Sequence, residues 1–240
     1  MENKISGCFI CGKSLKYFKP AKTFSCAVCQ KTFESEVACE DGHFVCNDCH
    51  AQKGIAAITF YALNSRSKDP VLIAFEMMKS PAVNMHGPEH HYLVPAALLA
   101  AYRNSGGNID LNESLATARQ RAKNVPGGIC GFWGSCGAAI GTGIFVSVAT
   151  KATPLSENEW SLANRMTAQS LNDISKNGGP RCCKRDSCLA VLQAVRFSEE
   201  HLGVFMEKPE RIQCEFYMNN KECKKEKCIF YAGFPKYPSD

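Results

Sequence analysis

The spacing of the cysteines constrains this chain more than any other feature of its sequence. Three CxxC pairs fall within the first 50 residues, at Cys8/Cys11, Cys26/Cys29 and Cys46/Cys49. A CxxC turn can present two thiolates to one metal ion, and two such pairs complete the tetrahedral set that zinc prefers. The spacing therefore predicts a zinc-binding module over residues 1–50.

Eight residues of this module have the right chemistry to bind two zinc ions. The first expected set is Cys8, Cys11, Cys26 and Cys29, and the second is Cys39, His43, Cys46 and Cys49. A cross-brace, in which alternate pairs share an ion, uses the same eight residues, so the partition between ions stays open. Because a 50-residue segment with few large apolar groups buries little surface, we expect metal binding to supply its folding energy.

Aromatic and basic residues alternate between the cysteine pairs. The aromatic residues are Tyr17, Phe18, Phe24 and Phe33, and the basic ones are Lys13, Lys16, Lys19, Lys22 and Lys31. This pattern is typical of single-stranded nucleic-acid binding, but also of a β-hairpin with one solvent-facing side. Six acidic residues in the same segment balance the charge, which favours the hairpin.

The composition and the N-terminal sequence limit the cellular compartment and the partners that we expect for this protein. The chain has 15 cysteines in 240 residues, and its N-terminus lacks the apolar core of a secretory signal. We therefore expect a cytoplasmic protein whose cysteines bind metal or act in redox chemistry, since disulfides are rare there. The longest weakly polar run, residues 137–149, is too short to span a bilayer. A net charge of +5 is too mild to require a nucleic-acid partner.

From residue 51 onward the apolar periodicity is helical. The sequence predicts a mostly α fold in three parts. The first is the small zinc-stapled module, a ribbon or cross-brace with short β-hairpins. It is followed by a helical domain of six to seven helices over 51–206, and by a cysteine-rich tail over 207–240 that packs on the helical domain. Expected helices cover 52–64, 70–80, 93–103, 111–123, 134–150 and 188–202. Another runs to Lys176 from a capping box formed by Ser156 and Glu159. Asp69 before Pro70 is a strong helix start.

A histidine-rich loop gives the first candidate site in the helical domain. His86, Glu89, His90 and His91 lie within six residues, and neutral imidazole suits zinc, iron or nickel. We expect His86 to bind a cofactor and His90 to ligate a metal or shuttle protons. Glu89 is the candidate base or the group that orients a ligand.

A glycine-rich segment gives the second candidate site in the helical domain. Seven glycines and the thiols of Cys130 and Cys136 lie between Gly127 and Gly143. Such density permits close approach of a ligand, or tight helix packing with the cysteines as core residues. A helix N-terminus after Cys136 should lower the pKa of its thiol, so Cys136 and Cys130 are the candidate nucleophiles or metal ligands.

The third candidate site surrounds adjacent cysteines. Cys182, Cys183 and Cys188 lie beside Arg181, Lys184 and Arg185, an electropositive setting that could hold a cofactor or an anionic substrate. Of Cys182 and Cys183, we expect one to face the site and the other the core. In the tail, Cys214, Cys223 and Cys228 suggest a further zinc or cluster site, with Cys188 or Cys183 as fourth ligand.

Convergence of these loops would join His86, His90, Cys130, Cys136 and Cys182 or Cys183 in one mixed site. Sulfur-rich donors favour an iron–sulfur cluster, such as a 4Fe–4S cluster, or a second transition metal besides the one or two zinc ions of the module.

Three motifs carry a resemblance to a known family: MHGPEHHYLVPAALLAAYRN, VPGGICGFWGSCGAAIGTGIF and GGPRCCKR. Together with ATPLS and GHFVCNDCH, they make the chain resemble a family of unknown function from anaerobic bacteria and archaea. The resemblance implies a cysteine-rich cytosolic protein and a protein partner of the methyltransferase or radical-SAM type. The chain itself has no CxxxCxxC triad and no Rossmann start, so no S-adenosylmethionine site is expected.

The leading hypothesis is a metalloprotein with structural zinc and a Cys/His metal or iron–sulfur site that performs redox or sulfur-transfer chemistry on a small anionic or sulfur-containing substrate. One alternative is a non-catalytic zinc module that recognises RNA or a protein. Another is a metal-dependent hydrolase, or a methyltransferase accessory, that uses the histidine-rich loop.

Overall fold

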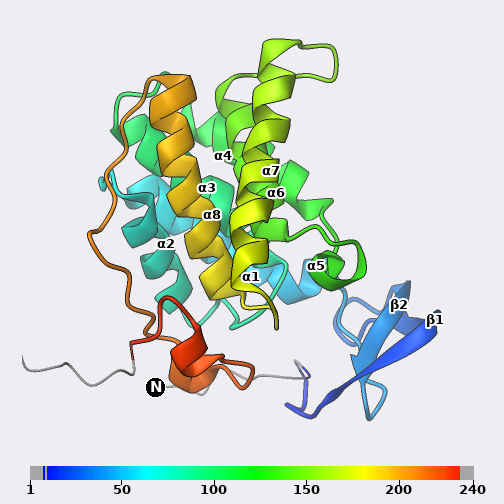
Figure 1. The fold of residues 1–240 in the computed structure, drawn as a ribbon. Coiled ribbons are helices and arrows are strands. Elements are labelled where there is room, and N and C mark those ends of the chain that lie inside the picture. Colours follow the sequence, from blue (N-terminus) through cyan, green and yellow to red (C-terminus); the bar gives the residue numbers. More distant parts are fainter. Residues whose placement is uncertain (1–7, 9, 233–240) are drawn as a thin grey trace, which may run out of the picture.

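Helix α3 (Glu89–Asn104) forms the centre of the helical body in the computed structural model, which describes residue 8 and residues 10–232. Thirteen of its sixteen residues are buried, and many are alanines that let neighbouring helices approach closely. Five helices pack against it: α1 (Asn47–Asn64), α2 (Pro70–Lys79), α4 (Leu111–Lys123), α6 (Gly137–Ala149) and α8 (Cys183–Phe197). Figure 1 shows α3 behind α8 in the middle of this bundle.

Two further helices complete the body. α7 (Asn158–Asn177) packs on α6 and α8, and α5 (Ile129–Phe132) is a single turn. A π-helical turn, Ser198–Leu202, extends α8. With seven helices of ten or more residues besides α5, the prediction of a mostly helical fold is confirmed. Among the residues described, no helix combines the length and apolar character needed to cross a membrane.

The N-terminal module contains the expected hairpin. Strands β1 (Leu15–Ser25) and β2 (Thr32–Cys39) are antiparallel, and Phe24 is paired with Phe33. Rings of Phe18, Phe24, Phe33 and Phe44 lie 5.5–5.9 Å apart between centroids, while Lys16, Lys19 and Lys22 are exposed. These four half-buried phenylalanines therefore form the small core of the module, whereas Tyr17 is exposed together with the basic residues.

Helix boundaries agree with the sequence where side-chain caps are formed. The Asp69 carboxylate accepts hydrogen bonds from the backbone N–H groups of Val71 (2.7 Å) and Leu72 (3.2 Å), which confirms this helix start. The capping box at Ser156 and Glu159 is wrong, because α7 begins at Asn158 without a side-chain cap and the Ser156 hydroxyl contacts Thr153 instead. α8 begins at Cys183, five residues before the expected start, with the Cys182 sulfur as cap.

After Gly203 the chain runs in extended form back along the body, and then folds into short turns at its lower end (Figure 1). The turns are two 3₁₀ helices, Tyr217–Asn219 and Lys225–Lys227, and the residues around them form one isolated bridge, Cys214 with Tyr231. We call residues 203–232 the C-terminal segment. It places three cysteines beside the first turn of α8.

Candidate metal centres and the adjoining cleft

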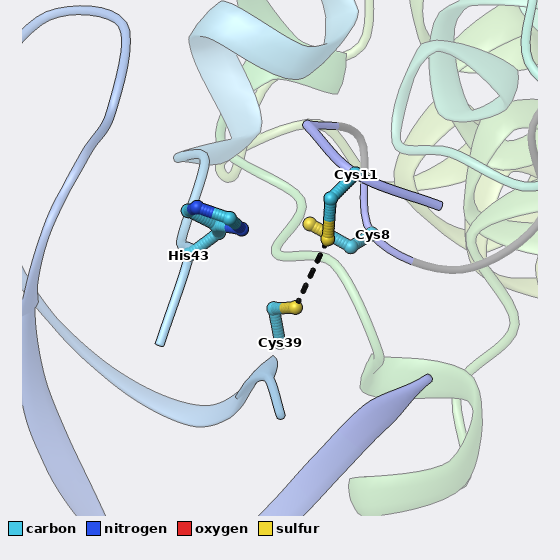
Figure 2. Close-up of side chains that lie close together, drawn as sticks. All are labelled: Cys8, Cys11, Cys39 and His43. Carbon is cyan, nitrogen blue, oxygen red and sulfur yellow. Dashed lines mark hydrogen bonds between the residues drawn. The ribbon is translucent and has the colours of Figure 1, made fainter. Parts of the chain in front are cut away.

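The eight predicted ligands of the module come together in two groups of four. Cys8, Cys11, Cys39 and His43 form one group, and Cys26, Cys29, Cys46 and Cys49 form the other. Alternate pairs along the chain therefore share a site, which is the cross-brace and not the sequential partition expected first. The crossing follows from the hairpin, because β2 returns Cys39 to the side of the sheet where β1 begins, next to Cys8 and Cys11 (Figure 2).

The spacing within each group fits a single tetrahedral ion. All ligand atoms of a group lie within 4.8 Å of one another. Sulfur atoms are 3.5 Å apart between Cys11 and Cys39, and 3.8 Å apart between Cys29 and Cys46. Thiolates bound at about 2.3 Å around a tetrahedral zinc ion are separated by about 3.8 Å. The two groups could each hold one metal ion of this kind.

Backbone N–H groups point at several of these sulfur atoms. Ile10 donates to Cys8 (3.4 Å), Asp41 donates to Cys39 (3.4 Å) and the amide of Cys46 donates to Cys26 (3.3 Å). Burial raises the pKa of Cys26, but hydrogen bonds from the backbone amides of Cys29, Cys46 and Val28 outweigh it and lower the pKa to about 6. Hydrogen bonds to charged thiolates stabilise them, so one thiol of each group, Cys8 or Cys26, has a lowered pKa, whereas the neighbouring Cys46 thiol and burial raise the pKa of Cys49 to about 12.

Helix α1 joins the module to the body. Cys46 is its N-cap, and Cys49 lies in its first turn, so half of one ligand group belongs to the helix. An ion pair of 3.1 Å between Asp48 and Lys123 links α1 to α4. Helix α1 therefore runs across the boundary predicted between residues 50 and 51 and belongs to both the module and the body.

Between the module and the body lies a cleft of about 1830 Å³. Module residues around Cys39 and His43 line one wall. The other wall contains residues from all three loops singled out by sequence: His86 and His91, Cys130 and Cys136, and Arg181 and Cys183. The expected convergence of the loops is therefore present, although not with all of the residues expected.

His90 and Glu89, the predicted catalytic pair, do not line the cleft. Both are buried, and the His90 Nδ1 atom lies 3.1 Å from the carbonyl oxygen of Gly87. The Glu89 carboxylate accepts hydrogen bonds from the backbone N–H (2.8 Å) and the side-chain amide (2.9 Å) of Asn84. These contacts place both residues in the buried packing that holds the histidine-rich loop in position. His91, which was not assigned a role, faces the cleft instead.

The residues around Glu89 keep its carboxyl group ionised. Burial raises the pKa of this carboxyl, but the imidazole of His50, whose Nδ1 atom lies 3.8 Å from the carboxylate, and that of His90 outweigh burial and lower the pKa to about 2. Gly87 is required here, because a Cβ atom at this position would lie 2.1 Å from the Glu89 carboxylate. The loop is therefore closed over an ionised carboxylate.

The glycine-rich segment serves helix packing. A Cβ atom on Gly137 would lie 2.1 Å from the His91 ring, so glycine lets α6 pack directly against this imidazole. The lowered pKa expected for Cys136 is wrong, because burial raises the pKa of this thiol to about 12. The amides of Ala138 and Ala139 at the start of α6 do stabilise the thiolate, but desolvation is the larger effect.

The adjacent cysteines point to different places. Cys183 lines the cleft, and burial raises its pKa to about 12 despite a hydrogen bond from the Gly87 amide. Cys182 lines a second, small pocket under the C-terminal segment, together with Cys188 and all three tail cysteines, Cys214, Cys223 and Cys228. The two side chains therefore line different spaces, and Cys182 also packs against the hydrophobic core.

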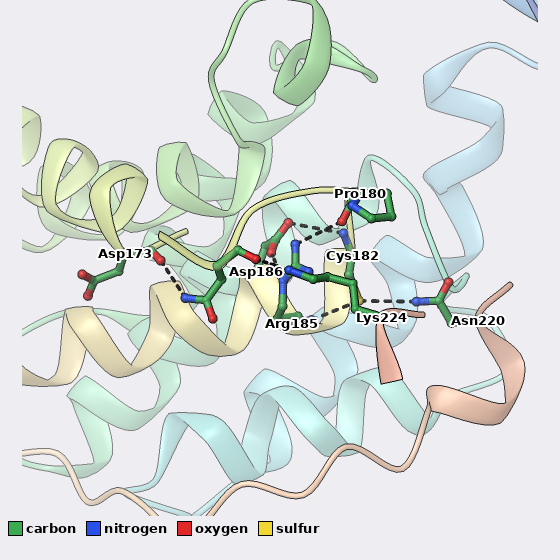
Figure 3. Close-up of polar contacts among 8 residues, drawn as sticks. Asp173, Pro180, Cys182, Arg185, Asp186, Asn220 and Lys224 are labelled. Atoms are coloured by element: carbon green, nitrogen blue, oxygen red, sulfur yellow. Dashed lines mark hydrogen bonds and ion pairs between the residues drawn. The ribbon is translucent and has the colours of Figure 1, made fainter. Parts of the chain in front are cut away.

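Only one of the three basic residues expected to hold an anion is available for that task. The Arg185 Nε atom pairs with Asp186 (2.8 Å), and its guanidinium also donates to the Pro180 carbonyl (Figure 3). The Lys184 ammonium is buried and donates to the Asn84 carbonyl (2.9 Å). Arg181 is exposed at the cleft.

Over residues 8 and 10–232, no third group of three or more Cys, His, Asp or Glu residues has its ligand atoms within 4.8 Å. The mixed site of imidazoles and thiols in the cleft is therefore not assembled as a compact single-ion site, and neither are the tail cysteines with Cys188 or Cys183. Asn84 and Asn220, which organise both regions through hydrogen bonds, were missed because an isolated asparagine carries no sequence signal.

Comparison with known proteins gives a family but no activity. No curated protein and no solved structure matches the chain significantly. A family model matches residues 58–231, which include most of the body, its cleft loops and most of the C-terminal segment, but not the metal-binding module. Because this match covers more than half of the chain, the protein belongs to a family of unknown function (DUF5714).

Proposed function

We propose that this protein is a zinc-containing metalloprotein that performs redox or sulfur-transfer chemistry on a small anionic or sulfur-containing substrate. The observation that carries the proposal is the cleft, where three loops distant in sequence bring cysteine and histidine side chains together opposite the metal-binding module. Two zinc ions in the module would fix one wall of this cleft, since metal binding folds small cysteine-rich segments.

Among the cleft thiols, we assign the reacting role to Cys130. Cys136 and Cys183 keep their protons at neutral pH, because burial raises the pKa of both thiols to about 12. Cys130 lies on the single-turn helix α5, beside the exposed residues Gly131 and Phe132. A substrate can therefore reach its sulfur from solvent, and the exposed Arg181 on the same cleft offers a positive charge to an anion.

Thiosulfate is a suitable probe because it is small, anionic and carries a transferable sulfur atom. The Cys130 sulfur attacks the outer sulfur of thiosulfate, the sulfur–sulfur bond breaks, and sulfite leaves with its electron pair. The thiol proton passes to solvent, and the cysteine is left as a persulfide. The products to measure are therefore sulfite and one added sulfur atom on the protein.

The experiment compares variants under anaerobic conditions. We expect Cys130→Ser to lose both products, and Arg181→Ala to weaken the dependence on thiosulfate concentration. Cys188→Ser is the matched control, since Cys188 lines the other pocket and should leave both products unchanged. Absence of persulfide and sulfite in the unmodified protein, together with no reversible redox signal between dithionite and ferricyanide, would show that the proposed function is wrong.

A further inference from the structure

The imidazole of His91 contacts both ends of residues 125–137, the stretch of chain that carries Cys130. At one end, the His91 Nδ1 atom lies 3.1 Å from the carbonyl oxygen of Val125. At the other end, a Cβ atom on Gly137 would lie 2.4 Å from the Nε2 atom, so the backbone at the start of α6 touches the ring. The loop that bears Cys130 therefore begins and ends at one histidine, and both side chains line the cleft.

The contact with Val125 decides which ring nitrogen of His91 carries the proton. A carbonyl oxygen only accepts hydrogen bonds, so Nδ1 donates, and the neutral ring has its lone pair on Nε2. Within the described part of the chain, no hydrogen bond reaches this Nε2 atom. Burial lowers the pKa of His91, although the Val125 hydrogen bond and the charge of Glu89 raise it, so the ring is neutral at pH 7. A neutral imidazole with an available lone pair is a proton acceptor.

The other histidines of the body near the cleft are engaged elsewhere. The Nε2 atom of His86 lies 3.2 Å from a side-chain amide oxygen of the C-terminal segment. The Nδ1 atom of His50 lies 3.8 Å from the Glu89 carboxylate, and His90 is buried away from the cleft. The imidazole of His91 is therefore the best placed of these rings to receive a proton inside the cleft.

The reaction proposed for Cys130 needs such a proton acceptor. A cysteine thiol without a neighbouring base is only a few per cent ionised at neutral pH, and the thiolate is the nucleophile. Two carboxylates at the body side of the cleft are already in ion pairs, Asp48 with Lys123 and Asp186 with Arg185. A carboxylate is also a weaker base than an imidazole.

We propose that His91 is the general base of the cleft and accepts the thiol proton of Cys130. The proton moves from the Cys130 sulfur to the Nε2 atom of His91 while the sulfur attacks the outer sulfur of thiosulfate. The sulfur–sulfur bond of thiosulfate breaks, sulfite leaves with its electron pair, and the imidazolium then releases the proton to solvent. This role rests on the proposed function, because it supplies the proton acceptor for the same thiol.

The loop between the two contacts lets the thiol approach the ring. No hydrogen bond between the described residues joins Cys130 to His91, and catalytic hydrogen bonds are often long until the substrate binds. Gly128 and Gly134, with φ angles of +83° and +67°, lie on either side of the single turn α5 that carries Cys130. Because glycine changes backbone conformation at low cost, α5 can shift between these two residues when a substrate enters.

The test follows two reactions of the full chain at pH 7. One is alkylation of Cys130 by iodoacetamide, measured by mass spectrometry of its peptide, and the other is sulfite release from thiosulfate. His91→Asn removes the Nε2 lone pair, while its side-chain amide can still donate to the Val125 carbonyl. We expect both rates to fall about tenfold, because an unassisted thiol is a few per cent ionised. The control His201→Asn alters an imidazole that lies beside Glu200, outside the cleft, and should keep both rates.

Two further measurements separate a base from a packing residue. In His91→Ala, added imidazole should restore the alkylation rate of Cys130, because it can take the place of the missing ring. In the unmodified protein, nitrogen NMR of the histidine rings should show the His91 proton on Nδ1. This second measurement needs no variant to fold.

Three results would overturn the inference. They are unchanged rates in folded His91→Asn, a loss of rate in His91→Ala that imidazole does not restore, and a His91 proton on Nε2. If the unmodified protein releases no sulfite but alkylation of Cys130 still depends on His91, the proposed function fails and the base remains. If His91→Asn releases sulfite at the full rate, the proposed function stands and the base is excluded.

Discussion

The metal-binding module and the pocket under the C-terminal segment both gather cysteine sulfur atoms, but at different spacing. In the module, each ligand group fits within 4.8 Å, and the ligands come from turns close together in sequence. In the pocket, no three of the thiols form such a group, and they come from the start of α8 and from a segment whose first cysteine, Cys214, follows Cys188 by 26 residues. The module can be organised by its ions, whereas the pocket depends on the helical body around it.

The largest difference between the module and the body should appear when metal is removed from the module. We expect zinc chelation, or Cys26→Ser, to unfold residues up to the start of α1 while the helical body remains folded, because structural zinc supplies about 10–16 kcal/mol in small zinc domains. Limited proteolysis and zinc content per chain measure this. Cys130→Ser, which alters a thiol outside both ligand groups, is the control. A module that resists proteases without zinc would contradict the expectation.

A smaller effect should arise at Glu89, which lies in the body directly below α1. Its folded pKa of about 2 is below the ordinary value of 4.5, so ionised Glu89 stabilises the fold by about 3 kcal/mol. This stabilisation is complete above pH 4.5 and is lost as pH falls toward 2.

The variant Glu89→Gln should therefore be less stable than the unmodified protein at neutral pH, and the difference should disappear on acidification. Urea unfolding followed by helical circular dichroism measures both proteins at each pH. Loss of zinc at low pH affects both proteins alike, so the difference isolates the carboxylate. A difference that stays constant from pH 7 to pH 3 would contradict the assigned charge.

The smallest effect concerns the surface contact between module and body. The Lys123 and Asp48 side chains are 60% and 58% exposed, so Lys123→Ala should lower stability by about 0.5 kcal/mol or less, and less still in high salt. Thermal unfolding at two salt concentrations measures this. A loss of several kilocalories per mole would mean that the ion pair, and not helix α1, holds the two regions together.

Sequence could predict the module well because its ligands are local. CxxC spacing defines pairs such as Cys8 with Cys11 without any knowledge of the fold, and only the pairing between pairs needed the register of the hairpin. The helical body was predictable for a similar reason, since apolar periodicity and the cap at Asp69 are read within one or two turns.

The cleft was harder to predict because burial decides the role of each side chain there. His90 and His91 are neighbours in sequence, yet the first is buried below the loop and the second faces the cleft. Cys136 precedes a helix, as expected, but the desolvation that raises its pKa comes from helices elsewhere in the chain. Desolvation depends on tertiary packing, so a motif alone does not reveal it.

Cys182 and Cys183 are neighbours in sequence, yet their sulfur atoms line different spaces. Cys182 is the extended N-cap of α8 and Cys183 is its first helical residue, so the change of backbone conformation at one peptide bond sends one sulfur to the small pocket and the other to the cleft. The start of α8 therefore fixes the direction of both thiols, and a substitution that moves the first residue of this helix would disturb two sites together.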